Sequence, residues 1–205
     1  MKLYYSPGAC SLSPHIVARE AGLPIQLVLV GRDKQLPDGR DFRTINPNGY
    51  VPALELDDGT VLTEGPAIVQ YLADQVPELG LAPPNGSIQR YQLQSWLNFI
   101  TTELHKTFSP LFNPKTPDAF KTMTREKLTD RFSFVNEQLG KDGRRYLTGE
   151  TFTVADAYLF VILRWAGAMG FELTRWPAIT RFIADVAARP AVDSALDAEK
   201  LKKAA

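Results

Sequence analysis

The 205-residue chain has few of the features that cross-link a protein or tie it to a charged or lipid partner. It contains a single cysteine, Cys10, which excludes an internal disulfide, so the fold has to rest on a buried core. Basic and acidic residues balance at 23 each, so no net positive charge favours a nucleic-acid backbone or an anionic membrane surface. No run approaches the roughly 18 apolar residues of a spanning helix. We therefore expect no nucleic-acid partner and no membrane partner.

The first residues also lack the apolar stretch of a secretory signal peptide, because Pro7-Gly8 interrupts them early. Together with the lone cysteine, this favours a reducing compartment, and we expect a cytoplasmic protein. The remaining composition, 44% hydrophobic and 22% charged, is typical of a globular chain with one large or two small domains.

The N-terminal part of the chain mixes strand and helix signals. Residues 3–5 and 26–30 are predicted strands, and the helix between them is expected to start at Ser13-Pro14 and to stop at Gly22. A β-α-β unit of this kind implies a parallel strand pair.

A long polar connection, residues 31–49, follows this unit. Residues 53–56 and 60–62 then alternate around an Asp-Asp-Gly turn, which is a strong hairpin signal, and a helix is expected to begin around Pro66. The order β-α-β followed by β-β-α is the thioredoxin-like arrangement.

Residues 76–87 contain three prolines and two glycines and are predicted to form a linker. Beyond the linker the pattern is helical only. Apolar residues recur at Tyr91, Leu93, Leu97, Ile100 and Leu104, and further helices are expected over 118–139, 154–169, 177–188 and 191–201. We therefore predict a thioredoxin-like α/β domain over residues 1–80 and an all-helical domain over 87–205.

The position of Cys10 suggests chemistry, because it lies between the first strand and the first helix. The positive end of a helix dipole and the free N–H groups of a first helical turn stabilise a thiolate. A lone cysteine can equally be a small buried apolar residue, so position alone leaves both interpretations open.

Two further segments could bind a peptide-like ligand. Val51-Pro52 opens a predicted strand, where a proline is tolerated, and a proline at this place is cis in thioredoxin-like folds. Glu64 and Gly65 come at a helix start, where free N–H groups attract a carboxylate and Glu64 could accept hydrogen bonds from an ammonium group. An ordinary loop proline and a dipole-complementing glutamate are the alternatives.

Taken together, these segments resemble the glutathione transferases, and in detail the beta class of bacteria. The resemblance covers essentially the whole chain. It rests on Tyr-Ser-Pro-Gly-Ala-Cys-Ser-Leu (5–12), Asn-Pro-Asn-Gly-Tyr-Val-Pro-Ala-Leu (46–54), Leu-Thr-Glu-Gly-Pro-Ala-Ile-Val-Gln-Tyr-Leu (62–72), Trp-Leu-Asn-Phe-Ile (96–100), Thr-Glu-Leu-His-Lys (102–106) and Thr-Val-Ala-Asp-Ala-Tyr-Leu (153–159). It implies a thioredoxin-like domain that binds glutathione, a helical second domain, a homodimer, glutathione as co-substrate without a further cofactor, and no metal.

The resemblance also implies a set of site residues. Cys10 would meet the sulfur of glutathione and form a mixed disulfide with it, and His105 would assist. The implied glutathione-binding residues are Ala9, Cys10, Lys34, Tyr50, Val51, Glu64, Gly65, Asn98, His105 and Lys106. Asn98 and His105 are seven residues apart and should share a helix face, with Asn98 reaching across from the partner of a dimer.

A second, hydrophobic and electrophilic substrate is expected beside glutathione. Phe108, Phe112 and Trp165 are candidates to line its pocket, although aromatic residues at helical spacing are as often core. His15 matches no contact of the family and is predicted to be structural. Thr153 and Asp156 form a predicted capping box that serves folding rather than catalysis.

The chain departs from the family pattern at two places: Gly65 stands where serine is usual, and the connection 31–41, which carries Lys34, is one residue shorter. The predicted function is conjugation of glutathione to hydrophobic electrophiles, with thiol–disulfide exchange through Cys10. The alternatives are a hydrophobic-ligand binding protein with little turnover and a glutathione-dependent reductive dehalogenase of aromatic degradation.

Overall fold

The computed structural model describes residues 1–202. The chain divides into two compact units, one formed by Met1–Ala82 together with the chain from Ala188 onward, the other by Pro83–Ala187. The expected domains of 1–80 and 87–205 differ from this division at the C-terminal end, because residues 188–202 belong with the first unit.

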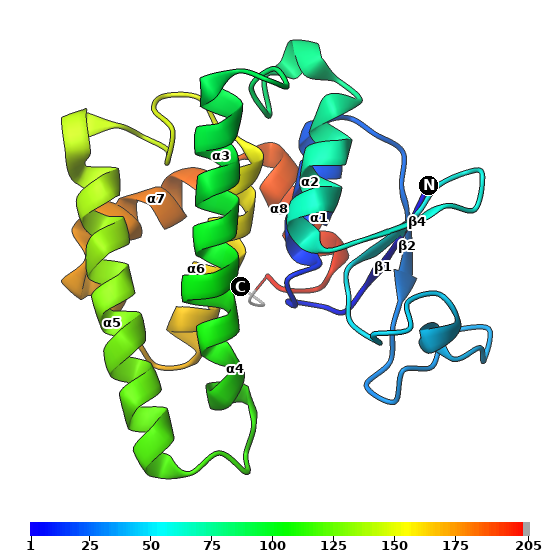
Figure 1. The fold of residues 1–205 in the computed structure, drawn as a ribbon, viewed down its shortest axis with the longest axis horizontal. Helices are drawn as coiled ribbons and strands as arrows, with labels where there is room; N and C mark the ends of the chain where they lie inside the picture. The colour runs from blue at the N-terminus through cyan, green and yellow to red at the C-terminus, as the bar shows by residue number, and fades with distance from the viewer. Residues whose placement is uncertain (203–205) are drawn as a thin grey trace. The chain divides into compact units, whose positions relative to one another are not determined.

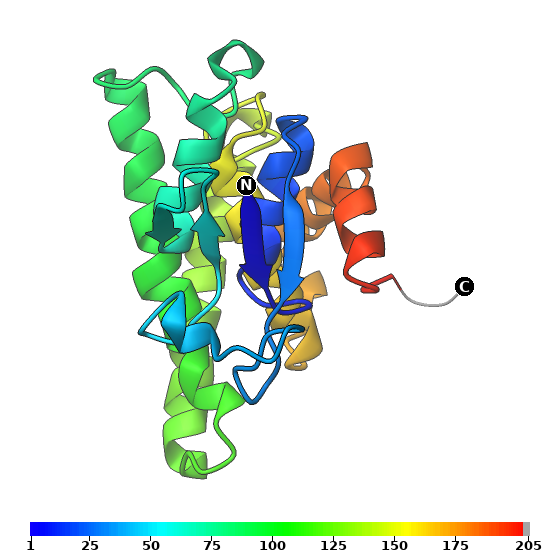
Figure 2. The same ribbon diagram turned by 90° about the vertical axis from the view of Figure 1, so that its right-hand side faces the viewer.

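The first unit is built on a four-stranded sheet with the order β2-β1-β3-β4. Its strands are β1 (Lys2–Tyr5), β2 (Gln26–Leu29), β3 (Ala53–Glu55) and β4 (Val61–Thr63). β1 pairs with β2 in parallel and with β3 antiparallel, and β3 pairs with β4 antiparallel. Figure 2 shows β1 in dark blue between β2 and β3. This is the thioredoxin-like arrangement predicted from the β-α-β and β-β-α order.

Three helices accompany the sheet: α1 (Leu12–Glu20), α2 (Gly65–Asp74) and α8 (Pro190–Ala198). A short 3₁₀ turn, η2, spans Pro77–Leu79. α1 packs against both α2 and α8. α1 crosses over between β1 and β2, as a parallel strand pair requires.

α8 joins the first unit through polar contacts that no sequence spacing could indicate. The side chains of His15 and Glu199 are both fully buried, and His15 Nδ1 lies 2.9 Å from Glu199 Oε1. Arg189 makes two hydrogen bonds of 2.6 and 2.8 Å to the carboxylate of Glu20. These pairs attach the C-terminal helix to α1 and agree with a structural role for His15.

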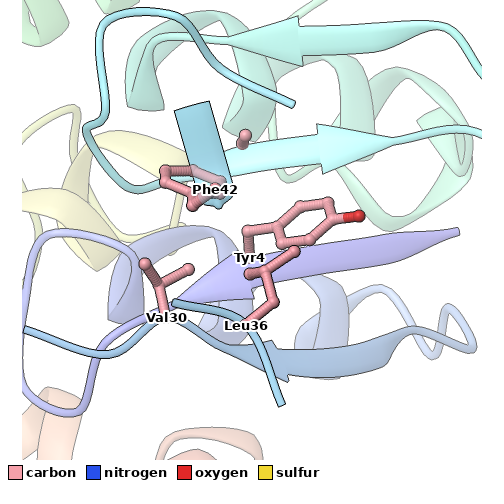
Figure 3. Packing of buried hydrophobic residues seen from close by; sticks show 5 residues of the cluster. Tyr4, Val30, Leu36 and Phe42 are labelled. Atoms are coloured by element: carbon pink, nitrogen blue, oxygen red, sulfur yellow. The ribbon is translucent and has the colours of Figure 1, made fainter. Parts of the chain in front are cut away.

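The polar connection after β2 is anchored by the apolar residues within it. Tyr4, Val30, Leu36, Phe42 and Ala53 form a buried cluster on one side of the sheet (Figure 3). Phe42 opens a 3₁₀ turn, η1 (Phe42–Thr44), and its ring centroid lies 5.5 Å from that of Tyr4. Burial and a hydrogen bond to Glu55 raise the pKa of Tyr4 to about 12.

The second unit is helical throughout its regular structure. It contains α3 (Ile88–Phe99), a π-helical segment η3 (Ile100–His105), α4 (Lys106–Phe112), α5 (Asp118–Gly140), α6 (Val154–Ala168) and α7 (Pro177–Ala187), with 3₁₀ turns η4 (Lys141–Gly143) and η5 (Leu173–Arg175). Figure 1 shows α3 continuing into α4 as one long helical run. The predicted helices are found within one or two residues, except the last, which ends at Ala198.

The predicted apolar stripe of the first of these helices is largely correct. Leu93, Leu97, Ile100 and Leu104 are buried, whereas Tyr91 is 59% exposed, so its place in the stripe was wrong. No helix within residues 1–202 is both long and apolar enough to cross a membrane.

The capping box before α6 is present as predicted. The carboxylate of Asp156 accepts hydrogen bonds from the backbone N–H groups of Thr153, at 2.8 Å, and Leu147, at 2.9 Å. Asp156 is fully buried, and these bonds fix the loop that leads into the helix. Its role is therefore structural.

Candidate active site

In the first unit, Cys10 lies directly before the residue that caps α1. The helix starts at Leu12 with Ser11 as its N-cap, two residues earlier than predicted from Ser13-Pro14. The difference arises because the turns before Ser13 already bond in helical fashion, with Leu12 N donating to Ala9 O and Ser13 N to Cys10 O. Cys10 is therefore closer to the positive end of the α1 dipole than expected, while the N–H groups of Leu12 and Ser13 are already bonded.

The Cys10 side chain meets the strand start that carries the proline. Its Sγ donates a hydrogen bond to the carbonyl oxygen of Val51 at 3.3 Å. The Val51-Pro52 peptide bond is cis, as predicted. A thiol can donate this bond and a thiolate cannot, so the contact describes the protonated side chain. The structure thus brings together two of the predicted site segments that are forty residues apart.

Two more candidate residues lie near the start of the polar connection and just after its end. Tyr50 is 70% exposed, and the ammonium group of Lys34 lies 5.9 Å from the centre of its ring. Lys34 has a positive φ of 67°, which few side chains other than glycine adopt without a local reason. Its backbone carbonyl accepts from Phe42 N at 2.8 Å, so the buried Phe42 turn holds Lys34 in place.

Glu64 and Gly65 form the start of α2. Glu64 is the N-cap with φ 66° and ψ 116°, and Gly65 is the first helical residue, followed by Pro66. The carbonyl of Glu64 accepts the N–H groups of Ala67 and Ile68, which leaves the Gly65 N–H at the open end of the helix. A Cβ added at Gly65 would meet only Pro52 Cγ, at 3.9 Å. The site therefore has room for the serine that is usual in the family.

In the second unit, His105 ends the π-helical segment, where Lys106 N donates to Thr101 O five residues back. A π-helical turn takes in more residues than the 3.6 of an α-helix, so seven residues do not close two turns here. The regular spacing from which a shared face of Asn98 and His105 was predicted is therefore interrupted, and the shared face itself stays a prediction. Asn98 is exposed, whereas His105 is partly buried.

His105 is held by two aromatic residues of α6. Its Nδ1 lies 2.5 Å from the hydroxyl oxygen of Tyr158, and its ring centroid lies 4.9 Å from that of Trp165 at a steep angle. Burial and then the ammonium of Lys106 lower the pKa of His105 to about 4, so the imidazole is neutral at pH 7. Any assistance from His105 at neutral pH therefore comes from a hydrogen bond rather than from a positive charge.

The three aromatic residues predicted to line the second-substrate pocket differ in burial. Phe108 is fully buried and packs against Phe112, Phe132, Trp165 and Phe171, so the core interpretation describes it. Phe112 is 46% exposed and packs edge-on against the half-buried Trp165 at 5.3 Å. Of the three predicted pocket residues, Phe112 and Trp165 have accessible aromatic surface.

Lys106 has different surroundings from the histidine beside it. It is exposed and lines a cavity of about 470 Å³ between α4 and α5, together with Phe120 and Met123. The structure therefore brings His105 and Trp165 together and gives Lys106 a separate apolar neighbourhood. Within residues 1–202 no group of three or more His, Cys, Asp or Glu side chains could hold a metal ion.

Comparisons with known proteins agree with this geometry. The model of the glutathione S-transferase N-terminal domain matches residues 8–75, and that of the C-terminal domain matches residues 99–190. Glutathione S-transferase GstA of Escherichia coli O157:H7 is 52% identical over 98% of this chain and all of its own length. The chain belongs to the glutathione S-transferase family. The fold and the enzyme class predicted from its sequence are thereby confirmed.

The solved structures that are similar to this chain include bacterial glutathione transferases. A ternary complex of BphK, a bacterial glutathione transferase, has a TM-score of 0.96 and 56% identity over 98% of this chain and 100% of that one. The beta-class glutathione transferase of Sphingomonas chungbukensis has a TM-score of 0.94 and 42% identity over the same shares.

The sequence did not indicate one residue of the candidate site in this transferase. Tyr158 contacts His105 across 53 positions of the chain. It lies within the segment 153–159, which contributed to the family resemblance, but the only role assigned there was helix capping. In the sequence, Tyr158 is a tyrosine two residues after Asp156, and a tyrosine at this place is equally typical of an ordinary core residue.

Proposed function

We propose that this glutathione transferase conjugates glutathione to hydrophobic electrophiles and also carries out thiol–disulfide exchange through Cys10. The observation that carries the proposal is the position of the Cys10 thiol, two residues before Leu12, the first residue of α1. A helix start favours thiolate, and thiolate is the form that attacks a disulfide.

The exchange step balances without a further reagent. Cys10 loses its proton to solvent, its thiolate attacks one sulfur of oxidised glutathione, and a new S–S bond forms as the old one breaks. One glutathione thiolate leaves and takes up a proton, and the other glutathione stays on Cys10 as a mixed disulfide. A second glutathione thiolate can release it by the same step and regenerate oxidised glutathione.

The first unit supplies the groups proposed to bind glutathione. The N–H of Gly65 at the start of α2 suits the γ-glutamyl carboxylate, and Glu64 suits the ammonium group. The backbones of Ala9 and Val51 flank the cysteine of glutathione, and Lys34, stacked near Tyr50, meets the glycyl carboxylate. These roles follow the family resemblance and the helix-start geometry.

The second unit supplies the proposed assistance and the second-substrate surface. His105, Lys106 and Asn98 are assigned to glutathione, with His105 acting at the sulfur. Phe112 and Trp165 offer the apolar surface that a hydrophobic electrophile needs. A double-mutant cycle between Cys10 and His105 tests this shared role, because residues that act on the same sulfur give non-additive losses.

We also propose a cytoplasmic homodimer. Ile88, Tyr91 and Phe134 of α3 and α5 are 65%, 59% and 38% exposed, more apolar surface than scattered single residues require. Beside them, a cavity of about 490 Å³ is lined by Trp96, Phe99 and Phe134. A second copy of the chain would cover this surface. A stable monomer in sedimentation at micromolar concentration would contradict the proposal.

The function is tested by incubating the protein with oxidised glutathione and measuring its intact mass. We expect one glutathione adduct on the wild type, removed by a reducing agent. Cys10→Ala is the matched control, because Cys10 is the only cysteine of the sequence and the variant has no thiol. A wild type that stays unmodified would show that Cys10 is only a packed side chain.

A further inference from the structure

The contact between His105 and Tyr158 connects two segments of the helical unit. Tyr158 belongs to α6 and is 2% exposed, and its hydroxyl lies 2.5 Å from His105 Nδ1. The two rings meet edge to face, 5.8 Å apart at 82°. A buried phenol that contacts an imidazole at this distance restricts both the position of the imidazole and the location of its proton.

The π-helical segment gives His105 its place opposite α6. The turn that ends at His105 is wider than an α-helical turn, since Lys106 N bonds to Thr101 O. Such wide turns occur mostly as short insertions in α-helices, frequently at functional sites. Here the widened turn ends on the residue assigned to the sulfur, and Trp165 packs against the same imidazole at 4.9 Å. The ring is thus fixed by a hydrogen bond and by an aromatic wall.

A neutral imidazole carries its hydrogen on one nitrogen only, and the partner of the other nitrogen decides which. If the phenol donates to Nδ1, the hydrogen is on Nε2 and the ring offers a donor. If Nδ1 donates to the phenol oxygen, Nε2 is a base. A phenol is a stronger hydrogen-bond donor than an imidazole N–H, which favours the first arrangement. Within residues 1–202, no hydrogen bond of Nε2 competes with it.

We propose that Tyr158 is a positioning residue whose hydroxyl donates to His105 Nδ1, keeps the hydrogen on Nε2 and sets His105 to donate a hydrogen bond to the reacting sulfur. This rests on the proposed role of His105 at that sulfur. His105 then stabilises the thiolate of glutathione as a donor and does not take up the proton, which leaves to water. No atom or electron is transferred to His105 in the step.

The tautomer can be measured directly, because the chain has only two histidines, His15 and His105. With ¹⁵N-labelled histidine at pH 7, we expect Nε2 of His105 to give the signal of a protonated nitrogen and Nδ1 that of an unprotonated acceptor. His105→Ala removes one of the two sets of signals and so assigns the other to His15. A protonated Nδ1 in the wild type overturns the proposal without any variant.

Tyr158→Phe keeps the ring and removes the hydroxyl. We expect kcat for conjugation to fall about tenfold with KM for glutathione nearly unchanged, and the His105 signals to shift toward a mixture of tautomers. Tyr146→Phe is the matched control: Tyr146 is also a 2% exposed tyrosine of the helical unit, outside the His105 contact. It should leave kcat and both tautomer signals as in the wild type.

The failures of the two proposals are distinguishable. If His105→Ala keeps full conjugation and exchange activity, His105 has no role at the sulfur. That part of the proposed function is then overturned. If His105→Ala is impaired while Tyr158→Phe keeps wild-type kcat and wild-type tautomer signals, only the positioning role is overturned. Should Tyr158→Phe not fold, the wild-type tautomer measurement decides alone.

Discussion

The two units present their candidate groups in different ways. In the first unit the groups are largely backbone: the carbonyl of Val51 and the N–H of Gly65 at the start of α2. In the second unit they are side chains held by other side chains far along the sequence, as His105 is held by Tyr158 and Trp165. We therefore expect side-chain substitutions to be tolerated better where the first unit acts through its backbone than where the second unit acts through its side chains.

The largest effect is expected at Asp156 in the helical unit. Asp156→Ala leaves the buried N–H groups of Leu147 and Thr153 without their acceptor and removes the carboxylate half of the capping box. We expect the free energy of unfolding to fall by roughly 3 kcal/mol, measured by urea denaturation.

The exposed Asp130 of α5 provides the control for this experiment. Asp130→Ala should change the free energy of unfolding by no more than about 0.5 kcal/mol. A loss of the same size in both variants would contradict the structural assignment of the capping box.

The next effect is a dependence of stability on pH through His105. Its pKa is 6.5 in the unfolded chain and about 4 in the folded protein. Between these values the unfolded chain binds a proton that the folded protein does not, so stability is full above pH 6.5 and falls as the pH drops toward 4. We expect a loss on the order of 2 kcal/mol, reduced where solvent reaches the ring.

His105→Gln should remove this part of the pH dependence. Urea denaturation of both proteins between pH 7 and pH 4.5 would show the wild type losing more stability than the variant as the pH falls. Parallel curves would mean that the imidazole titrates normally in the folded protein, and the neutral hydrogen-bonding role would then lose its basis.

The smallest effect is expected at Gly65 in the first unit. Gly65→Ser adds a hydroxyl at the start of α2, where the new Cβ would meet only Pro52 Cγ at an ordinary 3.9 Å. We expect KM for glutathione to fall about threefold, the value of one added hydrogen bond. Gly65→Ala has the same Cβ without the hydroxyl and should show no gain. An equal gain in both variants would point to helix stability rather than to ligand binding.

The contrast between the units also explains how much the sequence could predict. The thioredoxin-like order of strands and helices and the capping box at Asp156 depend on neighbouring residues and turn signals, so they were predicted correctly. The cis bond at Val51-Pro52, also correct, was predicted from the family resemblance. The start of α1 was predicted two residues late, because the turns before Ser13 already bond in helical fashion and Ser13-Pro14 falls inside the helix.

Other features depend on contacts between distant residues. The π-helical turn before His105 and the Tyr158 hydroxyl join segments separated by 53 positions, and no local pattern marks either. The return of α8 to the first unit depends on the buried pair of His15 and Glu199, which are 184 positions apart. Spacing rules assume a regular helix, so they could not show that the helix widens between Asn98 and His105.

We propose that Cys10 is the group that exchanges disulfides, while conjugation uses the sulfur that glutathione brings. The most direct test measures disulfide reduction and conjugation side by side in the wild type and in Cys10→Ala. We predict that the variant loses disulfide reduction and keeps part of its conjugation activity, because glutathione brings its own sulfur and the positive end of the α1 dipole still favours its thiolate. Full disulfide reduction by Cys10→Ala, at the wild-type rate, would contradict the account.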